Sequence, residues 1–311
     1  MRFVFVMDTL ERVDPDKDTT YGFLESADAR GHECLHALIH DVGYGDGAIT
    51  ARVRPIEVQP SGLSFRADFE HISLTDVDAV FVRKDPPFDD AYWYATLLLE
   101  QLRGQTLVLN DPRGLREANE KLYALNFARW TPRMLVSSNA AAIHAFVSSV
   151  GGQAVIKPLD GAGGYGVLAV REGDDNAKGI VDVLIDEGKR LAIVQEYIPE
   201  VSEGDKRVMM LDGELLGSIL RVPTGGDLRA NIHVGGSVVP CELTPRELEL
   251  VADVGPRLSR DGLVFVGLDL IGEKLTEVNV TSPTGIRELG RFRGDRPSDR
   301  VIAWVEDHAH H

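Results

Sequence analysis

Asp269, Glu277 and Asn279 have the residue types and spacing of a divalent-cation site. They lie in residues 264–282, where apolar residues alternate with others on both sides of a Gly-Glu-Lys loop, which is the pattern of a β-hairpin. A three-residue loop places Asp269 directly opposite Glu277, and carboxylates that face each other at about 5 Å repel. A bound cation would remove that repulsion, and oxygen ligands of this kind suit Mg²⁺ or Mn²⁺ better than zinc.

The same register fixes the neighbours of these residues. It pairs Ile271 with Leu275 and Gly267 with Asn279, so that the glycine leaves space through which a phosphate could approach. The apolar face of the hairpin, which begins with Val264, is expected to lie in the core. Repulsion also predicts that removing one acid stabilises the metal-free hairpin. The alternative is a solvated face whose acids carry no function.

A second stretch has the composition of a phosphate-binding loop. Lys157 ends a short apolar strand, and residues 158–166 after it contain Gly161, Gly163 and Gly164. Glycines let backbone amides approach an anion closely, and a lysine supplies a point charge. A P-loop and a dinucleotide fingerprint are excluded, because a second strand rather than a helix follows. The pattern predicts a glycine-rich hairpin that folds over a nucleotide as a flap, with a purely structural turn as the alternative.

Four basic residues lie next to predicted strands. Arg83 and Lys84 follow an apolar strand, at the carboxyl end where ligands of open α/β sheets bind. Arg207 and Arg221 flank a pair of strands and could form a fork for carboxylate and phosphoryl oxygens. The alternatives are a salt-bridged turn for the first pair and ordinary surface charges for the second.

Residues 222–240 contain four glycines and little helical or strand periodicity. A segment of this length without structure of its own is commonly a lid, and Arg229 in its middle could grip substrate oxygens when the lid closes. Earlier in the chain, residues 194–198 read VQEYI, a strand that could cross between lobes and offer backbone groups to adenine. An ordinary core strand is the alternative for that stretch.

The elements that position these residues begin with an α/β pattern. The predicted strands span residues 2–7, 33–40, 78–82 and 106–110, and the helices between them residues 20–30 and 92–103. Strands that alternate with helices predict a parallel sheet with covered faces, complete by about residue 120. The signals between residues 43 and 76 are weak.

Composition limits the function classes. The chain has 311 residues and a formal net charge of -16, from 49 acidic and 33 basic residues, with no basic stripe, so nucleic acid is not an expected partner. Cys34 and Cys241 form no CxxC pair, which fits a reduced compartment. No stretch of about 18 apolar residues is present, so no membrane partner is expected and the protein is expected to be cytoplasmic.

Three stretches resemble the prokaryotic glutathione synthetases, which belong to the ATP-grasp superfamily: RKDPPFD at 83–89, NEK at 119–121 and GLVFVGLDLIGEKLTEVNVTSPTGIRE at 262–288. The resemblance covers essentially the whole chain but departs from the family in the lid, which reads RANIHVGGS, and after Arg291. It implies an α/β and α+β fold. An N-terminal parallel-sheet domain (1–120) is followed by a two-lobed ATP-grasp region, with a small lobe (121–197) and a C-terminal lobe (198–311).

The resemblance also implies roles for individual residues. ATP would contact Lys121, Lys157, Gly161, Gly163, Gly164, Gln195, Glu196, Tyr197, Ile198 and Asp205, and Mg²⁺ or Mn²⁺ would bind Asp269, Glu277 and Asn279. Arg207, Arg221 and Arg229 would be catalytic, and Arg83, Lys84, Ser282 and Thr284 would bind substrate. The implied substrates are γ-L-glutamyl-L-cysteine and glycine, joined through an acyl phosphate, and the implied assembly is a homo-oligomer of four chains. The alternatives are another carboxylate-amine ligase and an ATP-binding regulatory module without turnover.

Overall fold

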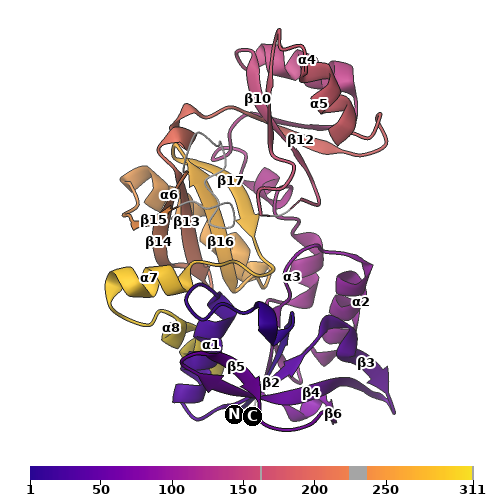
Figure 1. Ribbon diagram of the computed structural model, residues 1–311, viewed down its shortest axis with the longest axis vertical. Helices are drawn as coiled ribbons and strands as arrows, with labels where there is room; N and C mark the ends of the chain where they lie inside the picture. The colour runs from indigo at the N-terminus through magenta and orange to yellow at the C-terminus, as the bar shows by residue number, and fades with distance from the viewer. Residues whose placement is uncertain (162, 224–236, 310–311) are drawn as a thin grey trace.

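The described part of the chain folds into three β-sheets, each partly covered by helices (Figure 1). The computed structural model describes residues 1–161, 163–223 and 237–309. Short 3-10 helices lie at Leu10–Arg12, Ile39–Asp41, Leu74–Asp76, Glu100–Leu102, Tyr123–Phe127 and Pro199–Ser202. Within the described ranges, no helix is long and apolar enough to cross a bilayer.

The first sheet contains the parallel strands that the sequence predicts. Its parallel members are β1 (Arg2–Met7), β2 (Glu33–Ala37), β7 (Ala79–Arg83) and β8 (Leu107–Leu109), in the order β2-β1-β7-β8. Their apolar runs are buried on both faces, as in other parallel sheets. The helices are α1 (Thr19–Ala29), α2 (Asp90–Leu99) and α3 (Pro112–Glu117), and the side chains of Asp18, Asp89 and Asp111 cap their first turns.

Residues 42–73, where the sequence signals are weak, add antiparallel strands to the same sheet. They are β3 (Val42–Gly45), β4 (Ala48–Gln59), β5 (Gly62–Phe65) and β6 (Glu70–Ser73). Strand β4 is the long one and pairs antiparallel with β2. Its buried residues Ile49, Ala51 and Val53 alternate, but Pro55 interrupts the run, and a proline argues against a strand in a sequence.

A small lobe stands apart with a core of its own (Figure 1). Its antiparallel sheet has the order β11-β10-β12-β9, formed by β9 (Met134–Ser137), β10 (Gln153–Pro158), β11 (Leu168–Arg171) and β12 (Ala192–Glu196). Helices α4 (Ala140–Ser149) and α5 (Ala177–Leu184) pack on this sheet. The core of the lobe runs from Leu135 to Val194, whereas Tyr123, Phe127 and Trp130 pack with the rest of the molecule.

The third sheet is antiparallel, with the order β15-β14-β13-β16-β17. Its strands are β13 (Asp205–Leu211), β14 (Glu214–Val222), β15 (Ser237–Pro240), β16 (Phe265–Ile271) and β17 (Lys274–Asn279), with α6 (Pro245–Arg260) against them. Val222 pairs with Ser237, so both ends of the predicted lid belong to paired strands, and the expectation of little strand structure is wrong there. The rest of that segment, including Arg229, lies outside the described residues.

The β16–β17 hairpin has the predicted central register but a different turn. Asp269 pairs with Glu277, and Gly267 pairs with Asn279, as predicted. Ile271 pairs with Lys274 rather than with Leu275, so that prediction is wrong. The turn has two residues with positive φ, Gly272 and Glu273, which suits a tight hairpin. A bulge that contains Thr276 then restores the predicted register at the acids.

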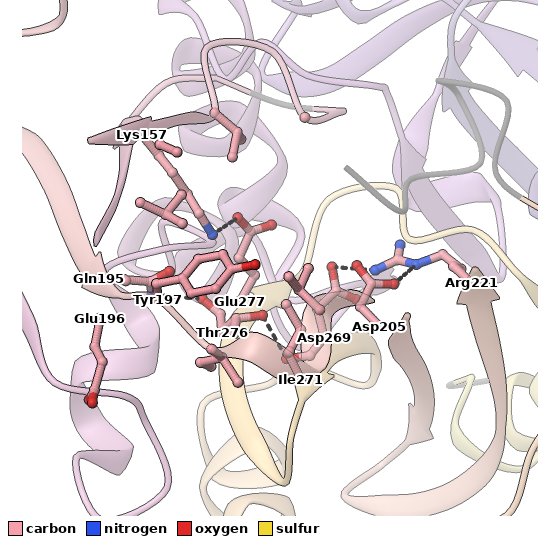
Figure 2. A pocket seen from close by; sticks show the side chains of 16 residues that line it. Lys157, Gln195, Glu196, Tyr197, Asp205, Arg221, Asp269, Ile271, Thr276 and Glu277 are labelled. Carbon is pink, nitrogen blue, oxygen red and sulfur yellow. Dashed lines mark hydrogen bonds and ion pairs between the residues drawn. The ribbon is translucent and has the colours of Figure 1, made fainter. Parts of the chain in front are cut away.

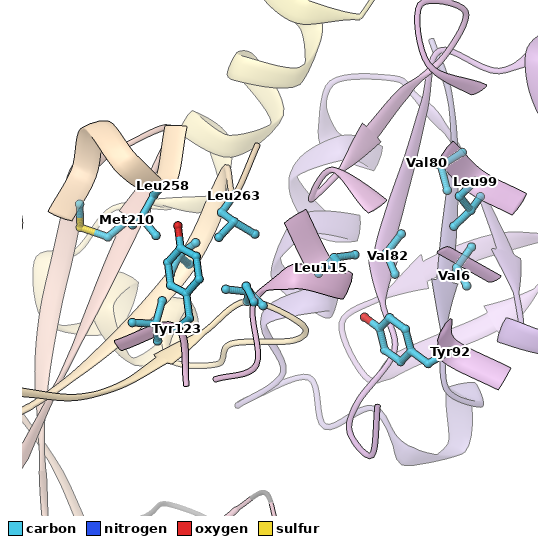
Figure 3. Packing of buried hydrophobic residues seen from close by; sticks show 14 of the residues in the cluster. Val6, Val80, Val82, Tyr92, Leu99, Leu115, Tyr123, Met210, Leu258 and Leu263 are labelled. Atoms are coloured by element: carbon cyan, nitrogen blue, oxygen red, sulfur yellow. The ribbon is translucent and has the colours of Figure 1, made fainter. Parts of the chain in front are cut away.

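Two of the three cores join the N-terminal region to the C-terminal lobe. The first contains Val6, Val80 and Tyr92 from the N-terminal sheet and Met210 and Leu263 from the C-terminal lobe. Figure 3 shows Leu115, on α3, between these two groups. The second core includes residues of α8 (Ser298–His308), which packs on α1, and of α7 (Ile286–Arg293). The N-terminal region and the C-terminal lobe therefore form one packed body, on which the small lobe stands.

Asn110 fastens the two parts of that body together. Its Nδ2 donates to the carbonyls of Phe265 (2.9 Å) and Val280 (2.7 Å), and its Oδ1 accepts from the amide of Phe265 (2.8 Å). Asn110→Ala leaves three buried backbone groups without these partners, so we expect the free energy of unfolding to fall by about 2 kcal/mol or more. Chemical denaturation measures the change. The exposed Asn176, whose side chain makes no cap bond, is the control, and an equal loss in Asn176→Ala would contradict the assignment.

Candidate active site

A pocket of about 880 Å³, counting its open mouth, lies where the small lobe meets the C-terminal lobe (Figure 2). Val155, Val167 and Ala169 form an apolar wall on the small-lobe side, and Ile271 contributes from the hairpin. The floor is ionic and carries Lys157, Asp205, Arg221, Asp269 and Glu277. An apolar wall above a charged floor suits a ligand with a flat ring at one end and anionic groups at the other.

Asp269 lies at the centre of a cationic clamp. Arg207 donates to it through two nitrogens, Nε to Oδ1 at 2.6 Å and Nη2 to Oδ2 at 3.2 Å, and Arg221 Nη2 lies 3.0 Å from Oδ2. Arg221 also binds Asp205, at 2.5 Å. Burial alone raises the pKa of Asp269, but Arg207 and Arg221 outweigh it and hold this pKa below its ordinary value of 3.8. Asp269 is therefore ionised at neutral pH.

Glu277 is paired with the lysines rather than with the arginines. Lys157 Nζ donates to its Oε1 at 3.1 Å (Figure 2). Burial raises the pKa of Glu277, but Lys157 and then Lys121 lower it by more, so this carboxylate is also ionised. Lys121 itself is buried and donates to Glu120 at 2.5 Å and to the carbonyl of Gly161. The predicted phosphate-binding lysines thus both lie beside the acids of the hairpin.

The repulsion between Asp269 and Glu277 is compensated by these cations. Each acid has its own partners, and the lowered pKa of each means that the folded structure favours its charged form. These pKa directions oppose the sequence-based expectation that losing one acid stabilises the metal-free hairpin, so we now expect the loss to destabilise it. The reason is that Lys157 and the two arginines come from strands far away in the sequence, which the hairpin pattern cannot reveal.

Asp269, Glu277 and Asn279 fit a divalent cation by the chemistry of their donors. Two ionised carboxylates face each other across the strands. Asn279 donates through Nδ2 to Asp269 Oδ2 at 3.2 Å, so its amide nitrogen, and not its oxygen, faces this acid. Oδ2 accepts from three side chains, whereas Oδ1 accepts from Arg207 alone among the described residues. No group of three His, Cys, Asp or Glu side chains that could hold a metal ion is found in the described part of the chain, and the predicted set has an amide as its third member.

Gly267 does not leave the open space that the sequence suggests. A Cβ atom at this position would lie 3.0 Å from Cδ of Arg207 and 3.0 Å from Cβ of Pro283. The expectation of a free phosphate approach at Gly267 is therefore wrong, because the side chain of Arg207 crosses the glycine on its way to Asp269. The glycine is what allows Arg207 to lie flat against the strand.

The glycine-rich loop connects β10 to β11, which pair antiparallel, as the flap interpretation requires. Gly163 and Gly164 have positive φ values of 63° and 81°, a backbone conformation that favours glycine. Gly161 packs against Pro158 and the backbone of Tyr165, and its carbonyl accepts from Lys121. Gly164 lines the pocket, so the loop lies over the same space as Lys157.

The end of β12 supplies the other side of the pocket. Gln195, Glu196, Tyr197 and Ile198 all line it, as predicted for a strand that crosses between lobes. Gln195 is buried and donates to the carbonyl of Thr276 at 3.3 Å, which ties the small lobe to the hairpin. In Figure 2 the side chain of Glu196 points away from the other labelled residues, so its contribution to the wall comes from near the backbone.

Another pocket, of about 1650 Å³ counting its open mouth, is lined by Arg207 of the clamp. Ser282 and Thr284, predicted to bind substrate, line it together with Arg207 and Asn279. Arg207 Nη1 donates to the carbonyl of Thr284 at 3.0 Å, which positions this loop against the clamp. Asp269 is thus gripped by Arg207, which lines the larger pocket, and by Arg221, which lines the smaller one.

Arg83 and Lys84 lie outside the linings of both pockets. Arg83 is buried and donates to Thr20 Oγ1 at 3.2 Å and to the carbonyl of Pro283 at 3.0 Å. Lys84 lies 3.2 Å from Asp8 and donates to the carbonyl of Asp85. Through Pro283, Arg83 holds the loop that carries Ser282 and Thr284. The described contacts of Arg83 thus position this loop and do not place Arg83 in the lining of either pocket.

Sequence reasoning missed several charged residues of the larger pocket. They are Arg12, Asp14, Lys17, Asp18, Asp85, Glu120 and Glu288. Four of them lie in the segment after β1, whose carboxyl end adjoins that of β7 because the two strands are parallel. The rule that ligands bind outside the carboxyl ends of strands applies to β1 as well as to β7, so this segment had a usable signal. Glu120 and Glu288 had no sequence signal beyond their places in the NEK and TSPTGIRE stretches.

Models of two protein families match the chain. The N-terminal domain of prokaryotic glutathione synthetase matches residues 1–116, and the ATP-grasp domain of prokaryotic glutathione synthetase matches residues 120–294. The chain is 42% identical to a glutathione synthetase of Synechocystis sp., over 98% of this chain and 99% of that relative. It is also 42% identical to a glutathione synthetase of Salmonella typhimurium, over 91% of each chain.

Solved structures with the same fold are more distant in sequence. A crystal structure of the D-cycloserine synthetase DcsG superposes with a TM-score of 0.66 at 15% identity, covering 98% of this chain and 100% of that one. A RimK domain protein of the ATP-grasp type from Sphaerobacter thermophilus superposes with a TM-score of 0.66 at 19% identity, covering 98% of this chain and 99% of that one. At these identities the likeness concerns the fold, which is that of ATP-grasp proteins.

Proposed function

Because the chain belongs to the prokaryotic glutathione synthetase family, we infer that its two adjoining pockets hold ATP and γ-L-glutamyl-L-cysteine for ligation to glycine. The chain is an ATP-dependent carboxylate-amine ligase. One observation carries the assignment of the pockets. Asp269 is bound by one arginine from each pocket, so groups held in the two pockets meet at a single charged centre.

The smaller pocket is the proposed ATP site. Val155, Val167 and Ile271 would enclose the adenine, and the end of β12 would offer backbone groups to its edge. Lys157 and Lys121 would then neutralise the phosphates, with the amides of the glycine-rich loop above them. Phosphoryl transfer depends mostly on positioning and charge neutralisation, which is what these groups supply.

The larger pocket is the proposed site of the acid substrate. The cysteinyl carboxylate would lie beside Arg207, where it accepts the γ-phosphoryl group of ATP and becomes an acyl phosphate. The amine of glycine, held near Ser282 and Thr284, would attack the acyl carbon, and inorganic phosphate would leave. Arg207 and Arg221 would stabilise the negative charge that develops in both steps. No nucleophilic side chain of the protein takes part in these two reaction steps.

A divalent cation, Mg²⁺ or Mn²⁺, is proposed to bind Asp269, Glu277 and Asn279, because two facing carboxylates and a neighbouring amide offer the oxygen ligands that these ions prefer. When bound, it would neutralise charge on the phosphates of ATP. Arg229 is proposed to act from the lid, within the segment outside the described residues. We also propose that the enzyme works in the cytoplasm as a homo-oligomer of four chains, without nucleic acid or membrane partners. The net charge of -16 supports the absence of nucleic acid.

The proposed substrates are tested by ADP release. We expect ADP to form only when γ-glutamylcysteine and glycine are both present, because the amine traps the acyl phosphate. A panel of other acids and amines, assayed under the same conditions, is the comparison. Faster turnover of a different pair would replace glutathione formation with another ligation.

The acyl phosphate is tested by an isotope. With oxygen-18 in the cysteinyl carboxylate, we expect one labelled oxygen in the phosphate released, because that oxygen passes to phosphorus when the intermediate breaks down. Mass spectrometry of the phosphate measures the label. Label that stays entirely in the peptide product would exclude an acyl phosphate, while leaving the identity of the substrates intact.

A further inference from the structure

Glu288, in the first turn of α7, is a buried acid with one ion pair among the described residues, to the exposed Arg291. Its residue exposure is 4%, and it lines the larger pocket. Oε1 lies 3.4 Å from Arg291 Nη2, whereas Oε2 is buried and receives no hydrogen bond from any residue that the structure describes. A buried carboxylate oxygen that lacks a donor is destabilising unless a ligand supplies one. The side chain therefore has an unmet requirement for a hydrogen-bond donor.

Glu288 lines the same pocket as Arg207, and the residues before α7 connect the two. Gly285, just before α7, packs against the side chain of Arg207, since a Cβ there would lie 3.5 Å from its Cγ. Glu288 follows three residues later in α7, and it lines the larger pocket together with Arg207. The reacting carboxylate is proposed to lie at Arg207, so Glu288 faces a part of the acid substrate remote from the reaction.

The charges around that remote part are of both signs. Asp18 and Asp85 line the pocket with Lys17 and Arg12. Asp18 is occupied as the cap of α1, where it accepts from the amides of Thr20 and Tyr21, so it is less available to a ligand than Glu288. A zwitterionic group, with an ammonium and a carboxylate on one carbon, would find an acid and a base within this region. The glutamyl end of γ-glutamylcysteine is such a group.

We propose that Glu288 binds the α-ammonium of the glutamyl residue and thereby selects γ-glutamyl acids over acids that lack this amine. The proposal rests on the proposed placement of γ-glutamylcysteine in the larger pocket. An ammonium supplies the hydrogen-bond donor that Oε2 lacks and a charge that complements the carboxylate. Glu288 is a specificity residue in this assignment and takes no part in phosphoryl transfer.

The test compares two acids, γ-glutamylcysteine and N-glutaryl-L-cysteine, which differ only in the amino group. In the wild type, we expect kcat/KM to be about 10- to 100-fold lower for the glutaryl compound, the range for losing a hydrogen bond between charged groups. In Glu288→Gln, we expect KM for γ-glutamylcysteine to rise by a similar factor and the preference between the two acids to shrink toward unity. KM for ATP and for glycine should stay within about twofold.

Glu25→Gln is the matched control. Glu25, on α1, forms an ion pair at 2.5 Å with Arg287, which lies next to Glu288 on α7. Because Glu25 does not line the larger pocket, this variant should keep the wild-type preference. Glu288→Asp, which keeps the charge on a shorter stem, should retain part of the preference and serves if Glu288→Gln does not fold. The proposal is overturned if the wild type uses both acids equally well. It is also overturned if Glu288→Gln lowers kcat/KM equally for both acids, or if only KM for glycine rises. Wild-type protein that turns over neither γ-glutamylcysteine nor its analogue would instead overturn the proposed function, and this inference with it.

Discussion

Glu277→Gln is expected to lower kcat by about 100-fold or more and also to lower the melting temperature. The activity falls because the substitution removes a full charge from the proposed metal site and from the neighbourhood of Lys157. The stability falls because Lys157 loses an ionised partner in a buried setting, at a cost of about 1–3 kcal/mol. Steady-state kinetics at saturating Mg²⁺ and thermal unfolding without metal measure the two effects.

Glu273→Gln is the control for this prediction. Glu273 lies in the turn of the same hairpin, is half-buried, accepts a hydrogen bond from Thr244 at 2.7 Å and lines neither pocket. We expect little change in kcat from this variant. A wild-type kcat in Glu277→Gln at saturating metal would show that Glu277 is not a ligand. A higher melting temperature would show that repulsion from Asp269 outweighs the attraction of the lysines.

Asp269→Asn is expected to cause the largest combined loss of activity and stability. The carboxylate is the shared partner of Arg207 and Arg221, and both guanidinium groups are buried. Removing one member of a buried ion pair leaves the other uncompensated, which destabilises proteins by about 3–5 kcal/mol. We expect a loss near the lower end of that range, since the amide keeps one acceptor oxygen, together with a kcat below the limit of detection.

The effect of Asp269→Asn should depend on pH in a defined direction. Because the pKa of Asp269 in the folded protein lies below its ordinary value of 3.8, the ionised carboxylate contributes stability above that value. The contribution declines as the pH falls through 3.8 toward the folded pKa. The difference in unfolding free energy between wild type and variant should therefore be full at neutral pH and shrink in acid.

The exposed pair of Asp295 and Arg293, 2.8 Å apart, provides the comparison for this effect. Pairs of this kind contribute little to stability, so Asp295→Asn should change the unfolding free energy by less than about 1 kcal/mol at any pH. Denaturant titrations of the three proteins across the pH range measure all of these values. A difference between wild type and Asp269→Asn that does not vary with pH would mean that the clamp does not depend on the charge of Asp269.

The predictions that succeeded rest on local periodicity. The parallel strands were predictable because each is a short apolar run followed by a helix, and the register that sets Asp269 against Glu277 followed from alternation on both sides of a glycine turn. The bulge at Thr276 was not predictable, since it replaces a three-residue loop by a two-residue turn and leaves the same pairs at the acids. Strand β4 was missed because Pro55 masks its alternation.

The features that could not be predicted concern partners distant in sequence. Nothing near Gly267 indicates that Arg207 crosses it, and nothing near Glu277 indicates that Lys157, 120 residues away, is its partner. Likewise, a basic residue at the end of a strand has the same sequence signal whether it faces a ligand or, as Arg83 does, holds a loop from within. Tertiary packing decides between these outcomes, and a single sequence does not encode it in local patterns.

The second core combines residues from both ends of the chain, so its parts cannot fold in the order in which they are synthesised. The second core contains Phe3, Phe5 and Phe23 from the first strands and helix, and it also needs Val301 and Ile302 of α8. As the ribosome adds residues in sequence, the N-terminal sheet emerges first, yet its apolar surface stays uncovered until the last helix is made. The small lobe, whose core runs only from 135 to 194, can close as soon as it has emerged. The middle of the chain can therefore fold before its beginning, and the N-terminal sheet exposes part of its apolar surface until α8 has been made.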